Sequence, residues 1–205
     1  MVINAHPAAA LVLVDLQLGL CRSPIGAEPN LLAVAVAERG VLSAAAAALE
    51  VARRRELHVA HVRLAFDAHH ANRTNHTARF DDHERAGRFA IGSESVEFCP
   101  EVAPRPGEPV FEKGSVSAFA STTLERALRA QGVQTIFLGG VATHLAVESL
   151  AREAADRGFN VVVLGDVCAA PSTVIHEHAI TQTIPLFAEV VDTHDFEQRL
   201  DAETG

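Results

Sequence analysis

This sequence contains little cysteine, no long apolar run and almost no lysine. Its three cysteines, Cys21, Cys99 and Cys168, are odd in number and show no paired short spacing, which argues against a disulfide framework and a zinc knuckle. The apolar run over 8–14 ends at Asp15 and is too short for export or for spanning a membrane. A formal net charge of -9 disfavours nucleic acid and anionic membranes as partners. We therefore expect a cytoplasmic protein that binds a small molecule.

Lysine occurs once, as Lys113 in the segment 111–119, and every other basic side chain apart from histidine is an arginine. A bias towards arginine explains why surface lysines are missing, but an ammonium does chemistry that a guanidinium cannot. Arginine stays protonated in proteins, whereas the pKa of a lysine shifts on burial and its compact charge suits a reacting group. A lysine retained by chance is the alternative. The exception therefore predicts a functional role for Lys113.

Strands and helices alternate along most of the chain. Continuous apolar runs rich in branched residues predict buried strands, and apolar residues at helical spacing predict helices. The expected strands cover 11–14, 58–64, a short run before Lys113, 135–140, 160–164 and 189–191. The expected helices cover about 32–55, 122–130, 144–157 and 172–183. This order predicts an α/β fold with βαβ units around a mostly parallel sheet.

The region from about 65 to 107 interrupts the alternation. It is polar and rich in glycine and proline, which in a compact domain indicates either a functional lid or a disordered insertion. Four interleaved phenylalanines favour an ordered loop with its own packing: Phe66, Phe80, Phe89 and Phe98. Because no repeat or linker marks a boundary, we expect one domain over 1–205 that carries this region as an insertion.

Asp15 and Lys113 each follow an expected strand. The carboxyl ends of parallel strands share one edge of the sheet, where ligands bind. An acid and an amine delivered to that edge by different strands are typical of a proton-transfer pair. The alternative for Asp15 is that it caps a helix.

Four ordered segments resemble the isochorismatase-like hydrolase superfamily. They are 13–17 (LVDLQ), 113–124 (KGSVSAFASTTL), 140–149 (GVATHLAVES) and 163–170 (VLGDVCAA). The resemblance implies a three-layer α/β/α domain, usually in a homo-oligomer, so we expect a homodimer or homotetramer. Known members include isochorismatases, nicotinamidases, carbamoylsarcosine-type amidohydrolases and ureide hydrolases.

The resemblance also marks a departure from the family pattern. Most members use an aspartate, a lysine and a cysteine, and the cysteine position is occupied here by Ala146. A methyl group can neither attack a carbonyl nor be activated by a base. Neither Cys168 nor Ser149 is a convincing substitute. The family's isochorismatases also carry a small residue there, and they cleave a vinyl ether by delivering a proton to the enol carbon.

We therefore predict Asp15 and Lys113 as the catalytic residues. Burial should raise the pKa of Asp15 and Lys113 should lower it, so the sequence leaves open whether Asp15 is an acid or a base. The resemblance implies a cis peptide between Val141 and Ala142, with backbone amides that bind an oxyanion or carboxylate. The predicted substrate-binding residues are Gln17, Phe66, Arg88, Phe119, Val141, Ala142, Thr143 and His144.

Several arginines flank the insertion, and one or more could hold a substrate carboxylate by a two-pronged contact. They are Arg63, Arg73, Arg79, Arg85 and Arg88. A metal site is a further hypothesis, because nicotinamidases of this superfamily bind a cation through an Asp-x-His arrangement near the second strand. The candidate ligands here are Asp67, His69, His70 and His76. Asp67 comes about three residues too late for that arrangement, and adjacent histidines in a polar loop are more often solvated. We expect neither a metal nor another cofactor.

Three functions remain open. The leading hypothesis is a non-covalent hydrolase of a small carboxylated metabolite, with isochorismate-type vinyl ether hydrolysis as its most concrete form. The second is water-mediated hydrolysis of an amide, ester or ring, or a lyase step in secondary metabolism, on the same Asp/Lys pair. The third is a catalytically silent binding or assembly protein, since loss of the nucleophile is also what a decayed enzyme would show.

Overall fold

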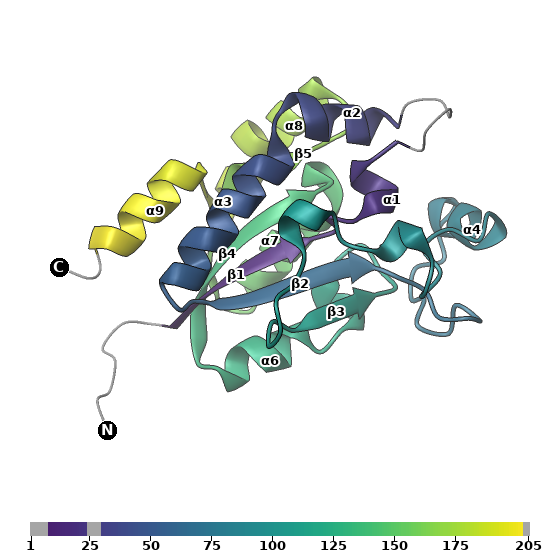
Figure 1. Ribbon diagram of the computed structural model, residues 1–205, viewed down its shortest axis with the longest axis horizontal. Helices are drawn as coiled ribbons and strands as arrows, with labels where there is room; N and C mark the ends of the chain where they lie inside the picture. Colours follow the sequence, from purple (N-terminus) through teal and green to yellow (C-terminus); the bar gives the residue numbers. More distant parts are fainter. Residues whose placement is uncertain (1–7, 24–29, 203–205) are drawn as a thin grey trace.

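The computed structural model describes residues 8–23 and 30–202, and a six-stranded sheet forms its centre (Figure 1). The strands are β1 (Ala8–Val14), β2 (His58–Leu64), β3 (Val110–Lys113), β4 (Val133–Val141), β5 (Asn160–Ala169) and β6 (Glu189–Val191). They lie in the order β3-β2-β1-β4-β5-β6, and every neighbouring pair is parallel. Strands β2 and β3 are added in turn on one side of β1, and β4, β5 and β6 are then added on its other side. The two directions part between β1 and β4, which is where open parallel sheets bind ligands.

Helices cover both faces of the sheet (Figure 1). One face carries α2 (Leu31–Glu38), α3 (Val41–Arg54) and α9 (Thr193–Ala202), and the other carries α5 (Ala118–Ser121), α6 (Leu124–Ala130) and α7 (Glu148–Asp156). Helix α8 (Thr173–His178) follows β5 along the chain. Side chains of a strand alternate between faces, so Leu11 and Leu13 of β1 enter the first core and Val12 and Val14 the second. The predicted three-layer α/β/α arrangement around a parallel sheet is confirmed.

The helix expected over 32–55 is two helices. Gly40 lies between α2 and α3 with a φ of 65°, a left-handed conformation that glycine adopts readily, and the two helix axes differ by 60°. The helix expected from residue 144 begins with a wide turn, η3 (Thr143–Val147), before α7. Strand β5 continues five residues beyond the expected end, because Cys168 and Ala169 pair with Gly140 and Val141 of β4. Helix α9 was not predicted.

The insertion over 65–107 is ordered and contains one further helix, α4 (Ala78–Arg85). Figure 1 shows α4 beyond the carboxyl ends of β2 and β3. Phe66, Phe80 and Phe89 are buried together in a small core of their own, whereas Phe98 packs against His61. Arg73 joins Asp81 and Glu84 and so ties α4 to the preceding loop. The remaining short helical elements are α1 (Leu18–Cys21), η1 (Glu94–Val96), η2 (Pro100–Val102), η4 (Ala179–Thr183) and η5 (Ile184–Leu186).

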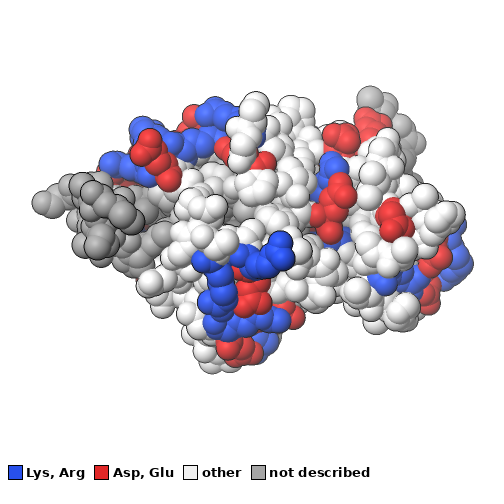
Figure 2. Space-filling model, turned by 90° about the horizontal axis from the view of Figure 1, so that it is seen from below, with Lys and Arg blue, Asp and Glu red and all other residues white. Residues whose placement is uncertain are grey.

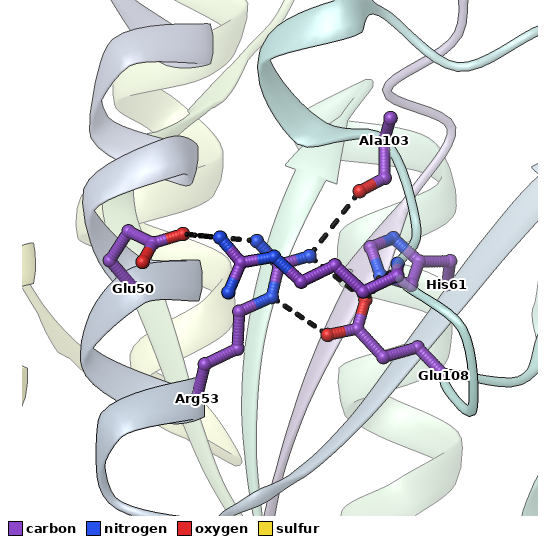
Figure 3. A network of polar contacts seen from close by, with 6 residues as sticks. Glu50, Arg53, His61, Ala103 and Glu108 are labelled. Carbon is purple, nitrogen blue, oxygen red and sulfur yellow. Dashed lines mark hydrogen bonds and ion pairs between the residues drawn. The ribbon is translucent and has the colours of Figure 1, made fainter.

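A polar network fastens the insertion to the sheet at the opposite, amino ends of β2 and β3. Figure 3 shows Glu108 between Arg53 of α3 and His61 of β2, at 2.7 Å and 2.9 Å respectively. Burial favours a raised pKa for Glu108, but Arg53, the amide of Arg105 and His61 together lower it to about 2. The carboxylate therefore stays charged at neutral pH, and its ion pair holds the end of the insertion against α3.

Charged side chains elsewhere lie mostly in mixed groups. Figure 2 shows acidic and basic side chains next to one another on the face it displays, separated by uncharged surface. Arg129 pairs with Glu125 within α6, and Arg157 also contacts Glu125. Over the described residues no single helix has the length and hydropathy of a membrane span; α2 and α3 reach these values only when taken together across their bend.

Candidate functional site

Asp15 and Lys113 meet in the protein interior. Asp15 follows β1, Lys113 ends β3, and the Lys113 Nζ lies 2.7 Å from the Asp15 Oδ2. Only 3% of Asp15 and 2% of Lys113 is exposed, so this is not a surface ion pair. Gln17, rather than Asp15, occupies the N-cap position of α1, which leaves no helix-capping role for Asp15. The pair therefore has the placement that proton transfer requires.

The backbone fixes the Asp15 carboxyl in position. Asp15 has a φ of 60°, uncommon outside glycine, and its N–H donates to the Val62 carbonyl at 2.8 Å. Residues held in such sparsely populated conformations cluster at functional sites. One carboxyl oxygen faces Lys113, and the other, Oδ1, is buried without a hydrogen-bond partner among the described residues.

Burial decides the direction in which the pKa of Asp15 moves. Desolvation raises it above the usual value, and this effect exceeds the lowering by the Lys113 ammonium, by the backbone of Leu64 and by the charge of Arg79. A raised pKa increases the fraction of protonated Asp15. Burial therefore shifts Asp15 towards its protonated form, a direction that the sequence left open.

A narrow pocket opens beside this pair, between the ends of β1 and β4. Val141, Ala142 and Ala146 line it from β4 and η3, and Arg79, Phe80 and His83 line it from α4. Its volume of about 40 Å³ holds no more than a few water molecules. An organic substrate therefore has to displace side chains, and those of α4 belong to the insertion rather than to the sheet.

The turn after β4 brings the backbone close to the reacting pair. The peptide bond between Val141 and Ala142 is cis, as the family resemblance implied. Gly140 has a φ of 136°, and a Cβ at this position would lie 2.0 Å from the Val14 carbonyl oxygen of β1. Only glycine fits where the two strand ends approach so closely. Ala146 lies one turn further on, 4% exposed, with its methyl group at the pocket wall.

Cysteine sulfur is absent from the described lining of this pocket. Cys168 is fully buried in β5, its Sγ donates to the Leu164 carbonyl at 3.2 Å, and burial raises its pKa to about 12. Cys21 and Cys99 are also buried and free of disulfide bonds. The pKa of Cys21 is raised well above its usual value by its hydrogen bond with Cys99 and by burial. Both Cys21 and Cys168 are therefore protonated thiols at neutral pH.

Four predicted substrate-binding residues lie outside the pocket lining. Within the described residues the Gln17 side chain bonds only to backbone, donating to the carbonyls of Leu64 and Ser95 and accepting from the Leu64 amide. Phe66 is buried in the core of the insertion, and Phe119 packs against Phe159 under α7. Thr143 Oγ1 shares a hydrogen bond of 2.9 Å with His176. In this structure these side chains hold the walls of the site instead of facing a ligand.

Arg88 and His144 lie outside the lining as well, whereas Val141 and Ala142 belong to it. The arginine that does line the pocket is Arg79, one of the five that flank the insertion. Over residues 8–23 and 30–202 no hydrogen bond or ion pair engages its guanidinium. Burial lowers the pKa of His83 and of His144, and the positive charge of Arg79 lowers both further. Among the described residues of the lining, Arg79 is thus a cation without a protein partner, whereas Lys113 is paired with Asp15.

Arg79 was predicted among the arginines that flank the insertion, whereas His83 was missed because no helix was expected in this stretch. Once α4 is formed, Arg79 and His83 lie one turn apart on the same side, which brings both to the pocket. The spacing could have been noticed, but without a periodic apolar pattern nothing indicated a helix in this polar stretch.

The described residues hold no cluster of histidine, cysteine, aspartate or glutamate that could bind a metal ion. Asp67 instead closes a turn: its Oδ1 accepts from the amides of Ala71 at 2.7 Å and His69 at 3.1 Å. These amide hydrogen bonds, chiefly that of Ala71, lower the pKa of Asp67. His70 stacks on Phe66 with ring centroids 4.9 Å apart.

Comparison with known proteins agrees with this arrangement. The family model described as the isochorismatase domain matches residues 9–195. A solved isochorismatase family protein from Burkholderia thailandensis is 30% identical, with a TM-score of 0.77 and coverage of 96% of this chain and 97% of that one.

Two curated relatives are named for amide hydrolysis. Maleamate amidohydrolase of Pseudomonas putida is 33% identical over 53% of this chain and 51% of its own length. Ureidoacrylate amidohydrolase of Methylobacterium radiotolerans is 32% identical over 64% of this chain and 51% of its own length. The chain thus spans about half the length of these relatives.

Proposed function

The chain belongs to the isochorismatase family, and we propose that it is a hydrolase of a small carboxylated metabolite, working by proton transfer without a thiol nucleophile. One observation carries this proposal. A buried Asp15–Lys113 pair, 2.7 Å apart, borders a pocket in which Ala146 stands where most members have a cysteine. The pair supplies an acid and a stabilising charge, and nothing at Ala146 can form a covalent intermediate.

Hydrolysis of an isochorismate-type vinyl ether is the most concrete version. Protonated Asp15 gives its proton to the terminal enol carbon, which leaves an oxocarbenium ion on the substrate and a carboxylate on Asp15. The Lys113 ammonium stabilises that carboxylate. Water then adds to the cation and returns a proton to Asp15, and the hemiketal collapses to pyruvate and an alcohol. The raised pKa of Asp15 supports this order, because the first step needs the acid form.

Arg79 holds the substrate carboxylate in this proposal. It lines the pocket with Asp15 and Lys113, and within the described chain its guanidinium has no other partner. A guanidinium binds a carboxylate through two parallel hydrogen bonds, which gives orientation as well as affinity. Because Arg79 lies on α4, substrate binding and displacement of α4 from the narrow pocket are coupled.

Amide hydrolysis on the same pair is the second candidate, favoured by the names of the two curated relatives. Here water rather than a side chain attacks the carbonyl, with Asp15 as the base and Lys113 beside it. The requirement for ionised Asp15 makes this reading weaker, since burial raises the pKa of that carboxyl.

One panel of assays separates these functions. Purified protein is offered isochorismate, maleamate, ureidoacrylate and simple lactones, with pyruvate, ammonia and ring-opened acid as the products measured. Pyruvate from isochorismate alone supports the vinyl ether reaction, and ammonia from the amides alone supports the second candidate. Turnover that persists in Asp15→Asn would contradict both. No turnover of any compound, together with measurable binding, would point to the binding or assembly protein.

A further inference from the structure

His83 is a buried polar residue whose ring nitrogens form no hydrogen bond within the described protein. It lies on α4, is 7% exposed and lines the same pocket as Asp15 and Lys113. Neither Nδ1 nor Nε2 has a hydrogen-bond partner there. Buried polar atoms are paired in nearly all cases, so two idle nitrogens at a pocket wall indicate a missing partner. The Asp15 Oδ1 atom in the same pocket is likewise unpaired.

Aromatic packing fixes the imidazole in this position. Phe80 and Phe89 form T-shaped contacts with the ring, at centroid distances of 5.9 Å and 5.1 Å and interplanar angles of 71° and 83°. The backbone carbonyl of His83 accepts from the Arg88 amide at 2.9 Å, which secures the end of α4. The ring is therefore held by packing against two aromatic rings, and neither of its buried nitrogens has a hydrogen-bond partner among the described residues.

The chemistry of the group limits what it can bind. Burial, and then the charges of Arg79 and Arg88, lower the pKa of His83 to about 4. A neutral imidazole offers one donor and one acceptor, and it attracts an anion less strongly than the guanidinium beside it does. The pocket thus presents two kinds of recognition, a cation at Arg79 and an uncharged hydrogen-bonding group at His83.

We propose that His83 binds the substrate directly, its ring nitrogens exchanging hydrogen bonds with an uncharged polar group, a hydroxyl or an amide, that lies beside the carboxylate held by Arg79. The preferred substrate class is then a small acid carrying such a group, in preference to an unsubstituted acid of the same size. This inference rests on the proposed function, because it takes the pocket to be the substrate site.

Two acids that no hydrolase can cleave test the inference. (E)-4-Hydroxybut-2-enoate and (E)-pent-2-enoate have the same shape and differ in a hydroxyl against a methyl group. Their dissociation constants are measured by NMR titration with wild type, His83→Phe and Arg79→Gln, and with His178→Phe as a control at an exposed histidine. Thermal unfolding of each variant is recorded without ligand.

We expect wild type and His178→Phe to bind the hydroxy acid at least about fivefold more tightly than the methyl analogue. His83→Phe should abolish that preference, bind the methyl analogue as wild type does and keep or raise the unfolding temperature. Arg79→Gln should weaken both acids. Three results would overturn the inference. The preference for the hydroxy acid could persist in His83→Phe, the unfolding temperature of His83→Phe could fall markedly, or wild type could bind neither acid. Hydroxyl preference without turnover in the assay panel would reject the proposed reaction and leave the role of His83 standing.

Discussion

Asp15 combines three properties that a residue seldom has together. Its backbone is left-handed, one carboxyl oxygen pairs with Lys113, and the other is buried without a hydrogen-bond partner among the described residues. The first property fixes the group, the second stabilises its anion, and the third leaves an oxygen for a substrate. In the proposed mechanism, replacing either partner removes proton transfer while the surrounding strands remain.

We expect Asp15→Asn and Lys113→Met each to lower turnover by about 10²–10⁴-fold, the usual contribution of acid–base catalysis. Activity is measured on whichever compound of the panel wild type converts, with circular dichroism to check the fold. Arg129→Gln, which removes an exposed ion pair with Glu125, is the control and should keep full activity. Retention of activity in either site variant would rule out the pair as the catalytic centre.

The position of Ala146 can be tested by giving it a thiol. The native cysteines are buried, so we expect iodoacetamide to leave folded wild type unmodified and active. Ala146→Cys should take up one carboxamidomethyl group, because the new sulfur lies at the pocket wall beside Lys113, whose charge favours the thiolate. Mass spectrometry of the native protein counts the groups added. Modification and inactivation of wild type would instead place one of the native cysteines in the site.

At the scale of elements, α4 and the end of β4 define the site. Helix α4 belongs to the insertion and brings Arg79 and His83 to the pocket, whereas β4 and η3 bring Val141, Ala142 and Ala146. The wall on the sheet side is continuous with the two main cores. The α4 side is held by a separate apolar cluster and by Arg73, so it is the side that can yield to a substrate.

Arg79→Gln should raise KM for a carboxylated substrate by about tenfold or more, equivalent to about 1.4 kcal/mol, with a smaller change in kcat. The matched control is Arg88→Gln, which alters the same insertion at an arginine outside the pocket lining. Steady-state kinetics of the two variants should differ in KM. Equal effects, or a larger effect at Arg88, would contradict the assignment of the carboxylate to Arg79.

Gly140→Ala tests the close approach of β1 and β4. The new methyl group would meet the Val14 carbonyl at 2.0 Å in a backbone conformation reserved for glycine. Gly158 is a control, because its φ is also positive, at 82°, but a methyl group added there would have no atom within 4 Å. We expect about 1–2 kcal/mol of destabilisation for Gly158→Ala from conformation alone, and clearly more for Gly140→Ala. Urea denaturation measures both.

The whole molecule carries several buried neutral histidines, which makes its stability depend on pH. Burial lowers the pKa of His83 and His176 to about 4, below the ordinary 6.5. Between pH 6.5 and about 4, these histidines are therefore protonated in the unfolded chain but remain neutral in the folded protein. Stability should fall between pH 6.5 and about 4, by about 1–3 kcal/mol per histidine. Asp15 acts in the opposite sense, because its raised pKa favours protonation in the folded state.

Urea denaturation at pH 7, 5.5 and 4.5 checks this dependence. Wild type should lose stability at each step, and His83→Phe should lose less than wild type over the same range. A loss in His83→Phe as large as that of wild type would show that His83 titrates normally, because Asp15 contributes equally to both proteins. Glu108, with its pKa of about 2, begins to lose its stabilising effect as the pH approaches its ordinary 4.5, but it does so equally in wild type and His83→Phe and leaves their comparison unchanged.

The alternation of apolar runs determined the order of strands and helices, because burial on both faces of a parallel sheet leaves a direct mark in the sequence. It also placed Asp15 and Lys113 at strand ends, and the expected last strand, 189–191, agrees with β6. Patterns that depend on one residue's backbone were harder to read, such as the break at Gly40. Helix α9 has a less evident apolar pattern and was missed.

Only the tertiary structure decided which side chains face the pocket. Gln17, Phe66, Phe119 and Thr143 are close to the site in sequence terms, yet their bonds and packing direct them into its walls. Arg79 and His83 come from a polar stretch with no readable pattern, and they reach the pocket because α4 folds over the strand ends. A sequence records which faces are buried, whereas the direction of a polar side chain depends on partners far along the chain. The pKa of Asp15 also depends on the tertiary structure. Burial raises it and Lys113 lowers it, and both effects arise only when the fold brings Asp15 and Lys113 together in the interior.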